Sequence, residues 1–128
     1  MDRRKKILLV EDDTALLAVY RSRLELEGFA VSEVHNGEDA LSAVVDVRPD
    51  LILLDVMIPK ISGFDVLDIL RNTPDTTNVR VIMLTALSQP KDKARAKQLG
   101  ADDYLVKSQV MIGDVVARIK YHLGMSQE

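Results

Sequence analysis

The sequence contains no cysteine and no tryptophan, and aromatic residues make up only 4% of its 128 positions. Without cysteine, neither a disulfide framework nor a thiolate metal site can form, which is compatible with a reducing compartment. The chain also lacks an excess of basic charge, because 17 basic residues face 20 acidic residues. We therefore expect no direct binding of nucleic acid, since contacts with phosphates require surplus positive charge.

Long hydrophobic runs are absent as well. The apolar run behind the basic start MDRRKK extends only from Ile7 to Val10. A signal peptide needs about 7–15 apolar residues and a membrane helix about 20. We expect a cytoplasmic protein without a membrane contact, in which the basic start is a solvated approach to a strand.

The length and the 47% hydrophobic content allow the chain to bury a core of its own. We expect a single domain over residues 1–128, with its core at about 5–123. Residues 124–128, GMSQE, form a short polar tail in this interpretation. The tail is compatible with a chain terminus and equally with the start of a linker.

Five short apolar runs, each followed by a helix-like segment, set the fold class. They begin near Ile7, Ala30, Leu51, Val79 and Asp102. This alternation predicts an α/β fold with a parallel sheet. The runs ILLV and LILL are continuous, as in central strands covered on both faces, whereas AVSEV includes polar residues and is typical of an edge strand.

The expected helices carry start and stop signals. Asp13 or Thr14 can cap the first helix, and the second, near 38–46, stops before a proline. The third helix starts at about Gly63 and ends before Pro74. Helical spacing of apolar residues marks the fifth helix, at Ile112, Val115, Val116, Ile119 and Leu123.

The segment expected to form the fourth helix, PKDKARAKQLG, has a weak apolar face. Only Ala94, Ala96 and Leu99 can make apolar contacts there. Because little apolar area would be buried, this helix should be held weakly and is a candidate moving part.

Polar residues follow four of the five runs. The first run ends in Glu11 and Asp12, the third in Asp55, the fourth in Thr85 and the fifth in Lys107. In a doubly wound sheet, ligands bind beyond the carboxyl ends of the strands. The sequence therefore predicts three acids, a hydroxyl and an amine at one edge of the sheet.

Taken singly, these residues have ordinary explanations, such as helix capping by the acids or a solvated charge for Lys107. Together they are harder to explain, because clustered carboxylates require a cation and a buried lysine requires an anion. Ligation by oxygen alone suits a hard ion. We therefore predict a site for a divalent metal, a hard ion such as Mg²⁺.

The stretches ILLVEDD, DLILLDVMIPKISGFDVL, VIMLTA and GADDYLVK resemble the receiver domain of bacterial two-component response regulators, over about residues 5–123. The resemblance implies a doubly wound, flavodoxin-like sheet of five parallel strands in the order 2-1-3-4-5, with five helices. It also implies a signalling phosphoacceptor that assists only its own phosphorylation and dephosphorylation, and is otherwise not an enzyme.

The resemblance assigns roles to the acidic residues. Asp55 matches the aspartate that attacks phosphorus and becomes an acyl phosphate. Glu11 and Asp12 match the acidic pair that holds Mg²⁺, together with Asp55 and the backbone carbonyl of Met57. The resemblance thus implies Mg²⁺ as the cofactor.

The same resemblance assigns the remaining site residues and the partners. Lys107 would neutralise the transferring oxygens, and Thr85 with Tyr104 would form a switch that remodels the fourth helix, fifth strand and fifth helix. The implied phosphoryl donor is a phosphohistidine on a sensor histidine kinase or phosphotransfer protein, and the implied receiver of the signal is an effector domain or protein. Four charged residues resemble the face through which one transcription-factor subfamily forms a homodimer, namely Asp102, Asp103, Asp114 and Arg118.

Two departures from the family pattern carry expectations of their own. Ser108 stands where the family usually has proline after the lysine, so we expect a trans Lys107–Ser108 bond and a rearranged loop. Met57 and Leu87 are apolar at variable positions beside the site. Neither side chain can orient a water molecule, so we expect a long-lived phosphorylated state.

Three other functions compete with the receiver interpretation. A phosphatase with an aspartate nucleophile needs a second Asp two residues later, where this chain has Met57. A flavodoxin-type flavin module needs a Ser/Thr/Gly-rich phosphate loop, where this chain has EDDTALL. The alternative that stays open is an unphosphorylated pseudo-receiver used for protein interaction, although the intact acids, Thr85 and Lys107 argue against it.

Overall fold

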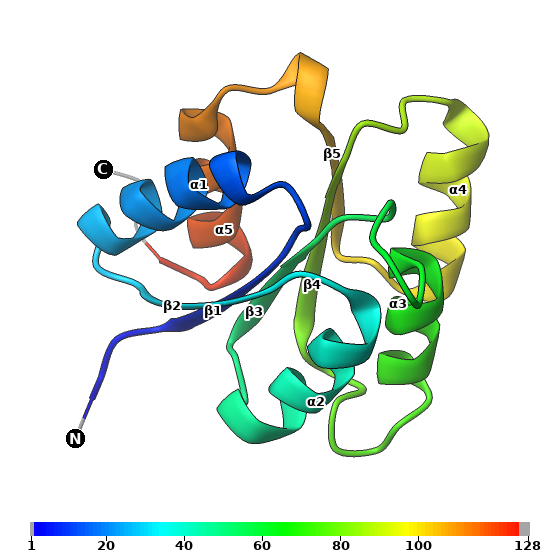
Figure 1. The fold of residues 1–128 in the computed structure, drawn as a ribbon, viewed down its shortest axis with the longest axis horizontal. Helices are drawn as coiled ribbons and strands as arrows, with labels where there is room; N and C mark the ends of the chain where they lie inside the picture. Colours follow the sequence, from blue (N-terminus) through cyan, green and yellow to red (C-terminus); the bar gives the residue numbers. More distant parts are fainter. Residues whose placement is uncertain (1, 126–128) are drawn as a thin grey trace.

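The computed structural model describes residues 2–125, and the expected tail residues 126–128 lie outside the described residues. Strands and helices alternate throughout (Figure 1). The elements are β1 (Lys6–Val10), α1 (Thr14–Leu26), β2 (Ala30–Val34), α2 (Gly37–Val47), β3 (Leu51–Leu54), α3 (Gly63–Arg71), β4 (Arg80–Thr85), α4 (Pro90–Leu99), β5 (Asp103–Val106), the 3-10 turn η1 (Lys107–Gln109) and α5 (Ile112–His122). Met125 packs against the core, although it falls in the segment expected to be a polar tail.

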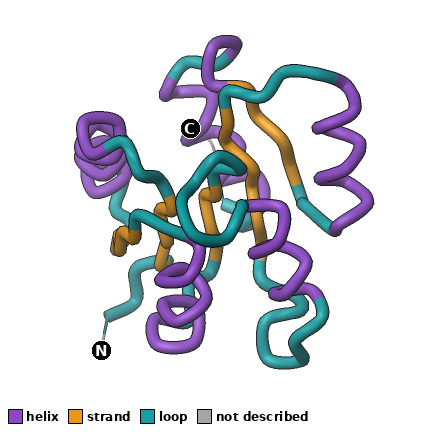
Figure 2. The backbone as a smooth tube through the Cα atoms, turned by 45° about the vertical axis from the view of Figure 1, so that its right-hand side comes forward, coloured by secondary structure: helices purple, strands orange, loops and turns teal. Residues whose placement is uncertain are grey.

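The five strands form one parallel sheet in the order β2-β1-β3-β4-β5, which confirms the predicted fold class (Figures 1 and 2). β1 and β3 lie in the middle, and Val10 pairs with Leu54 at their ends. The mixed run AVSEV forms β2 at an edge, as expected from its polar residues. The observed order is the one that the resemblance implies, and the continuous apolar runs lie in the middle of the sheet, as expected.

Helices cover both faces of the sheet. α1 and α5 lie on one face, where Ile7 and Leu9 of β1 contribute to their core. α2, α3 and α4 lie on the other face, where Leu8 and Val10 contribute to a second core (Figure 1). Alternate residues of a strand point to opposite faces, so a central strand must be apolar at every position.

Helix starts agree with the local signals. Of the two residues that could cap α1, Asp13 is the cap, because its Oδ1 accepts hydrogen bonds from the amides of Ala15 and Leu16 at 3.0 and 3.1 Å. α3 starts at Gly63, as predicted. A Cβ at Gly63 would lie 2.2 Å from the carbonyl oxygen of Asp55, so only glycine permits this close approach.

α4 is the least buried helix of the second layer. Ala96 is its only buried residue, which confirms the expectation of a weak apolar contact. The guanidinium of Arg95 lies 4.5 Å from the centre of the Phe64 ring in α3. This cation–π contact supplements the small apolar area that α4 buries.

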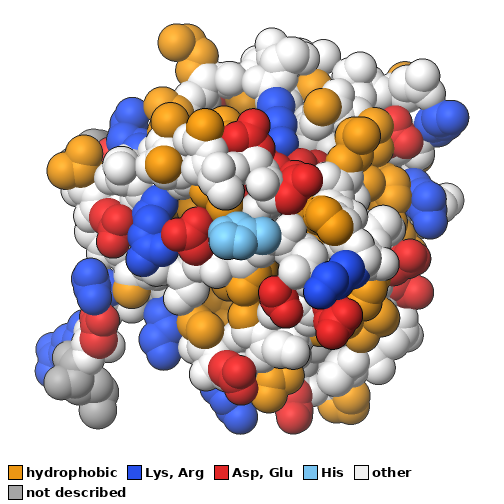
Figure 3. Space-filling model, viewed as in Figure 1, with side chains coloured by type: hydrophobic (Ala, Val, Ile, Leu, Met, Phe, Trp, Pro, Cys, Tyr) orange, Lys and Arg blue, Asp and Glu red, His pale blue; other side chains and the backbone are white. Residues whose placement is uncertain are grey.

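The surface carries charges of both signs. On the face drawn in Figure 3, acidic and basic side chains are interspersed with apolar ones. Within residues 2–125, no helix combines the length and the apolarity that crossing a bilayer requires.

Candidate functional site

Glu11, Asp12 and Asp55 meet at the carboxyl edge of the sheet. β1 and β3 are parallel neighbours, and the amide of Asp55 donates to the carbonyl of Val10 at 3.1 Å. The three side chains each offer a carboxylate oxygen within 4.8 Å of the others. Glu11 and Asp55 are buried, whereas Asp12 is exposed. The sequence prediction of clustered acids is met by this geometry.

Lys107 reaches this cluster from the end of β5. Its Nζ donates to Asp55 Oδ2 at 2.9 Å and also to Glu11 Oε1. The second oxygen of Glu11 accepts hydrogen bonds from the amides of Asp12 and Asp13 at 3.0 and 3.3 Å. Both oxygens of Glu11 therefore have partners within the chain, which leaves Asp12 as the more accessible acid.

The pKa values in this cluster reflect burial and close charges. Burial raises the pKa of the Glu11 carboxyl, and the Asp55 carboxylate adds to this effect, while the hydrogen bond from Lys107 opposes it. Burial alone would lower the pKa of Lys107, but its hydrogen bonds to Asp55 and Glu11 raise it. The ammonium therefore stays charged beside the acids.

The charge balance and donor set of the cluster fit a hard divalent cation. Three formal carboxylates and one ammonium leave an excess of negative charge, and every side-chain donor is an oxygen. The amide of Met57 donates to Asp55 Oδ1 at 3.1 Å, which places this backbone beside the acids. Within the described residues, no hydrogen bond reaches the Met57 carbonyl, so this oxygen is free to bind an ion.

Thr85 and Tyr104 contact the same residue from two sides. Thr85 is fully buried, and its Oγ1 accepts a hydrogen bond from the Leu87 amide at 3.4 Å. The Tyr104 ring is turned inward with 9% exposure, and its hydroxyl donates to the Leu87 carbonyl at 2.8 Å. The backbone of Leu87 thus links the two residues that were expected to form a switch.

The loop after β5 begins with the trans Lys107–Ser108 bond, which confirms the prediction from the missing proline. The residues that follow form the 3-10 turn η1. This turn carries the chain away from the site while the side chain of Lys107 points back to the acids. With serine after it, Lys107 still contacts both Glu11 and Asp55.

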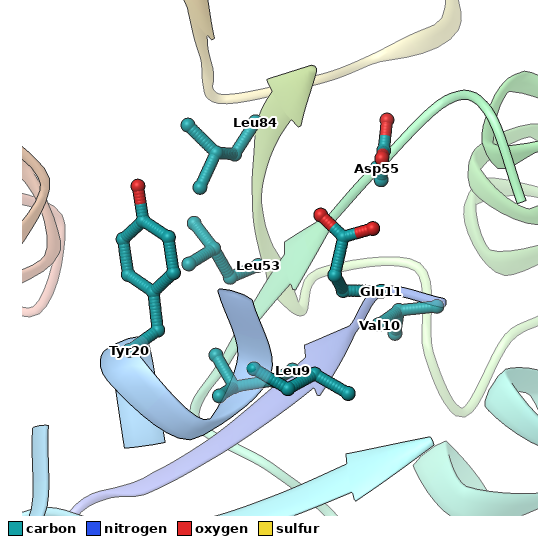
Figure 4. A pocket seen from close by; sticks show the side chains of 8 residues that line it. Leu9, Val10, Glu11, Tyr20, Leu53, Asp55 and Leu84 are labelled. Carbon is teal, nitrogen blue, oxygen red and sulfur yellow. The ribbon is translucent and has the colours of Figure 1, made fainter. Parts of the chain in front are cut away.

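Tyr20 is a site residue that the sequence pattern did not single out. It lies on α1 and lines a small hollow together with Glu11, Asp55 and Leu84 (Figure 4). Burial raises the pKa of its hydroxyl. Its position on α1, on the same face as the buried Leu17 and Leu24, is typical of a core residue, and only its phenolic hydroxyl distinguishes it from its apolar neighbours.

Comparison with known proteins agrees with the geometry. Residues 7–120 match the family described as the response regulator receiver domain. The transcriptional regulatory protein CpxR of Escherichia coli is 48% identical over 121 residues, covering 94% of this chain and 50% of CpxR. The DNA-binding dual master transcriptional regulator RpaA of Synechocystis is 38% identical over 115 residues, covering 90% of this chain and 47% of RpaA. This chain therefore spans about half the length of these relatives.

Solved structures share the same arrangement. The BeF3-activated receiver domain of Klebsiella pneumoniae RstA superposes with a TM-score of 0.87 at 28% identity, covering 93% of this chain and 98% of that one. A CheY-like receiver domain protein from Methanospirillum hungatei gives a TM-score of 0.87 at 28% identity, covering 94% of each chain. With its sheet order, its acidic cluster and these matches, the chain belongs to the receiver domain family of two-component response regulators.

Proposed function

We propose that this chain accepts a phosphoryl group on Asp55 in a Mg²⁺-dependent reaction. The observation that carries the proposal is the setting of the Asp55 carboxylate. It is 5% exposed, with one oxygen held by the Met57 amide and the other by Lys107 Nζ. Glu11 and Asp12 offer further oxygens within 4.8 Å. A carboxylate fixed in this way is prepared for nucleophilic attack.

In the proposed reaction, an oxygen of Asp55 forms a bond to phosphorus as the bond between phosphorus and the imidazole nitrogen of a phosphohistidine breaks. The imidazole leaves with the bonding electron pair and then takes up a proton. Lys107 stabilises the negative charge on the phosphoryl oxygens, since its ammonium already lies 2.9 Å from Asp55. The small side chain of Ala86, directly after β4, leaves room for the group.

Mg²⁺ would be held by Asp12, Asp55 and the backbone carbonyl of Met57, with Glu11 binding through water. The bound ion would supply positive charge and orient the phosphoryl oxygens. Asp12 has the role of direct ligand because it is exposed, whereas both oxygens of Glu11 have partners in the chain. The Met57 side chain takes no part, since a thioether is a poor ligand for a hard ion.

The test is the intact mass of the protein after incubation with Mg²⁺ and a small phosphodonor such as acetyl phosphate. We expect the parent to gain one phosphoryl group, and Asp55→Asn, which keeps the shape of the side chain, to gain none. Chelation of Mg²⁺ should abolish the gain in the parent. A parent that stays unmodified would favour the pseudo-receiver alternative, and labelling of the folded Asp55→Asn variant would exclude Asp55 as the acceptor.

We further propose that the phosphoryl donor is a phosphohistidine on a sensor histidine kinase or phosphotransfer protein, and that the output passes through an effector. The relatives CpxR and RpaA support a transcriptional effector, because both are transcriptional regulators of about twice the matched length. A homodimer through α4, β5 and α5 is part of this proposal. The charged residues of this proposed dimer interface include Asp103 on β5 and Arg118 on α5.

A further inference from the structure

Arg71, the last residue of α3, binds three separate segments of the chain. Its Nη1 donates to the carbonyls of Thr77 and Val79 at 3.2 and 2.6 Å, in the connection to β4. Its Nε donates to the carbonyl of Gly100 at 2.9 Å, just after α4. Its Nη2 donates to Asp102 Oδ2 at 3.1 Å, just before β5. With 17% of its side chain exposed, Arg71 is a largely buried connector.

Asp102 fixes the other end of this network. Its Oδ2 also accepts a hydrogen bond from the amide of Val81 at 2.8 Å, and its own amide donates to the Val81 carbonyl at 2.9 Å. The start of β5 is thereby tied to β4 through both backbone and side chain. Through Asp102, Arg71 therefore binds a residue that is itself fixed to β4 by hydrogen bonds, rather than a residue in a free loop.

The C-terminal end of α4 is closely fitted to Arg71. Gly100 caps this helix with a φ of 100°, a left-handed conformation that favours glycine. A Cβ at this position would lie 3.1 Å from the Cγ and Nε atoms of Arg71. The amide of Ala101 donates to the carbonyl of Ala96 at 3.0 Å, which closes the last turn. This end of α4 is thus fixed by directed bonds and by close packing.

The N-terminal end of α4 is held far less firmly. Its N-cap residue, Gln89, makes no side-chain capping bond, and the only buried residue of the helix, Ala96, lies in the C-terminal half. The bond from Tyr104 to the Leu87 carbonyl is the nearest tether in the preceding loop. α4 follows β4 after a short loop and runs back along the sheet, so its N-terminal end lies at the carboxyl ends of the strands (Figure 1). Asp55 follows β3 at this same end of the sheet.

We propose that Arg71 is the pivot of α4: it anchors the C-terminal end of the helix at Gly100 and Asp102, so that the switch displaces only the N-terminal end. The anchoring is a property of the resting protein. The displacement rests on the proposed phosphorylation of Asp55, because it requires an event at the carboxyl edge of the sheet. Arg71 is a positioning residue, since it contacts none of the acidic site residues directly.

The test is residue-resolved amide hydrogen exchange on the full chain by NMR. In the resting protein, Arg71→Gln should speed the exchange of the Ala101 amide by about tenfold or more, because four directed bonds are lost. The Lys93 amide, in the first turn of α4, should change by less than about twofold. Arg71→Lys should not restore slow exchange at Ala101, since an ammonium group cannot replace the planar guanidinium and its several N–H donors.

Two further variants control for a general loss of stability. Arg80→Gln removes a more exposed arginine that also bonds Asp102, at 3.3 Å, and should leave the exchange at Ala101 unchanged. Gly100→Ala keeps Arg71 but strains the left-handed backbone and the fit to Arg71 together, so faster exchange at Ala101 there reports only on the tightness of this end of α4. If Arg71→Gln fails to fold, Arg71→Lys, which keeps the charge, decides the anchoring. Slow exchange at Ala101 in the deciding variant would overturn the proposal.

Addition of Mg²⁺ and beryllofluoride, a phosphoryl mimic, tests the displacement. In the parent we expect altered exchange at Lys93 and unaltered exchange at Ala101, and in Arg71→Gln we expect the change to spread to Ala101. Equal changes at both ends of α4 in the parent would overturn the pivot. If beryllofluoride alters no amide near Asp55, the proposed function fails, whereas the anchoring is still decided by the resting variants.

Discussion

Asp55 is oriented by groups of its own chain before any donor arrives. Met57 positions one carboxylate oxygen through its amide, and Lys107 positions the other through its ammonium. The Met57 side chain is not needed for this contact and is 58% exposed. In the proposed reaction, the orientation of Asp55 is therefore independent of the Met57 side chain, which can vary while Asp55 keeps both contacts.

The lifetime of the phosphorylated state should depend on Met57. Leu87, the second apolar neighbour, packs against the core between the sheet and α2, α3 and α4, so Met57 is the one of the two that stays exposed. Met57→Asn should speed loss of the phosphoryl group by roughly fivefold, because one amide that orients the attacking water contributes about 1 kcal/mol. Decay of the phosphorylated protein measures this, with Met57→Leu as the apolar control. Equal decay rates in the parent, Met57→Asn and Met57→Leu would contradict this role of Met57.

Asp103 should make stability depend on pH in the acidic range. Burial opposes ionisation of its carboxyl, but hydrogen bonds from Arg118 at 2.6 Å and His122 at 2.9 Å hold its pKa below the ordinary value of 3.8. A lowered folded-state pKa adds stability above about pH 4, and this contribution is lost as the pH falls through the folded-state pKa. Asp103→Asn should therefore cost about 1 kcal/mol at neutral pH. Urea unfolding at several pH values should show this difference shrinking below about pH 4, and a constant difference would contradict it.

The loop between β3 and α3 depends on glycine at one position. Gly63→Ala would place a Cβ 2.2 Å from the Asp55 carbonyl oxygen, so either α3 or Asp55 must shift. We expect a loss of at least about 1–3 kcal/mol in the free energy of unfolding. Gly113 of α5 is the matched control, because a Cβ there meets nothing within 4 Å. Gly113→Ala should be neutral or stabilising by up to about 1 kcal/mol. Denaturant titration of both variants measures their free energies of unfolding, and equal values would contradict this prediction.

The elements could be predicted because their signals are local. Each apolar run predicted a strand, and Asp13 and Gly63 marked helix starts that the structure confirms. The proximity of the acids after β1 and β3 could be predicted, because neighbouring parallel strands end at the same side of the sheet. The bonds of Arg71 to Gly100 and Asp102 could not be foreseen, since they join residues 29 and 31 positions apart and depend on how the loops before β5 fold.

The proposed phosphorylation site and the Arg71 anchor lie at opposite ends of the strands of the sheet. Asp55 and Lys107 lie at the carboxyl ends of their strands, whereas Asp102 lies at the opposite edge, where β5 begins. A helix that extends from one end of the strands to the other, and is anchored at one end, can convert a local change into a larger movement of its free end. In the proposed function, the surface built by α4, β5 and α5 is therefore the part of the molecule in which phosphorylation of Asp55 would alter the shape offered to a partner.

Activation should also change the association of the whole molecule. In the described chain, Asp103 pairs with Arg118 of the same chain, so a dimer that uses these charges must exchange partners across the interface. Asp103→Arg and Arg118→Asp each place like charges opposite one another in a homodimer, and each should weaken association by at least about tenfold. Mixing the two variants restores opposite charges in a heterodimer. Sedimentation with Mg²⁺ and beryllofluoride should therefore show a dimer for the parent, monomers for each variant alone, and a dimer for the mixture. A monomeric mixture beside a dimeric parent would place the interface elsewhere, and a monomeric parent at high micromolar concentration would remove the dimer from the proposed function.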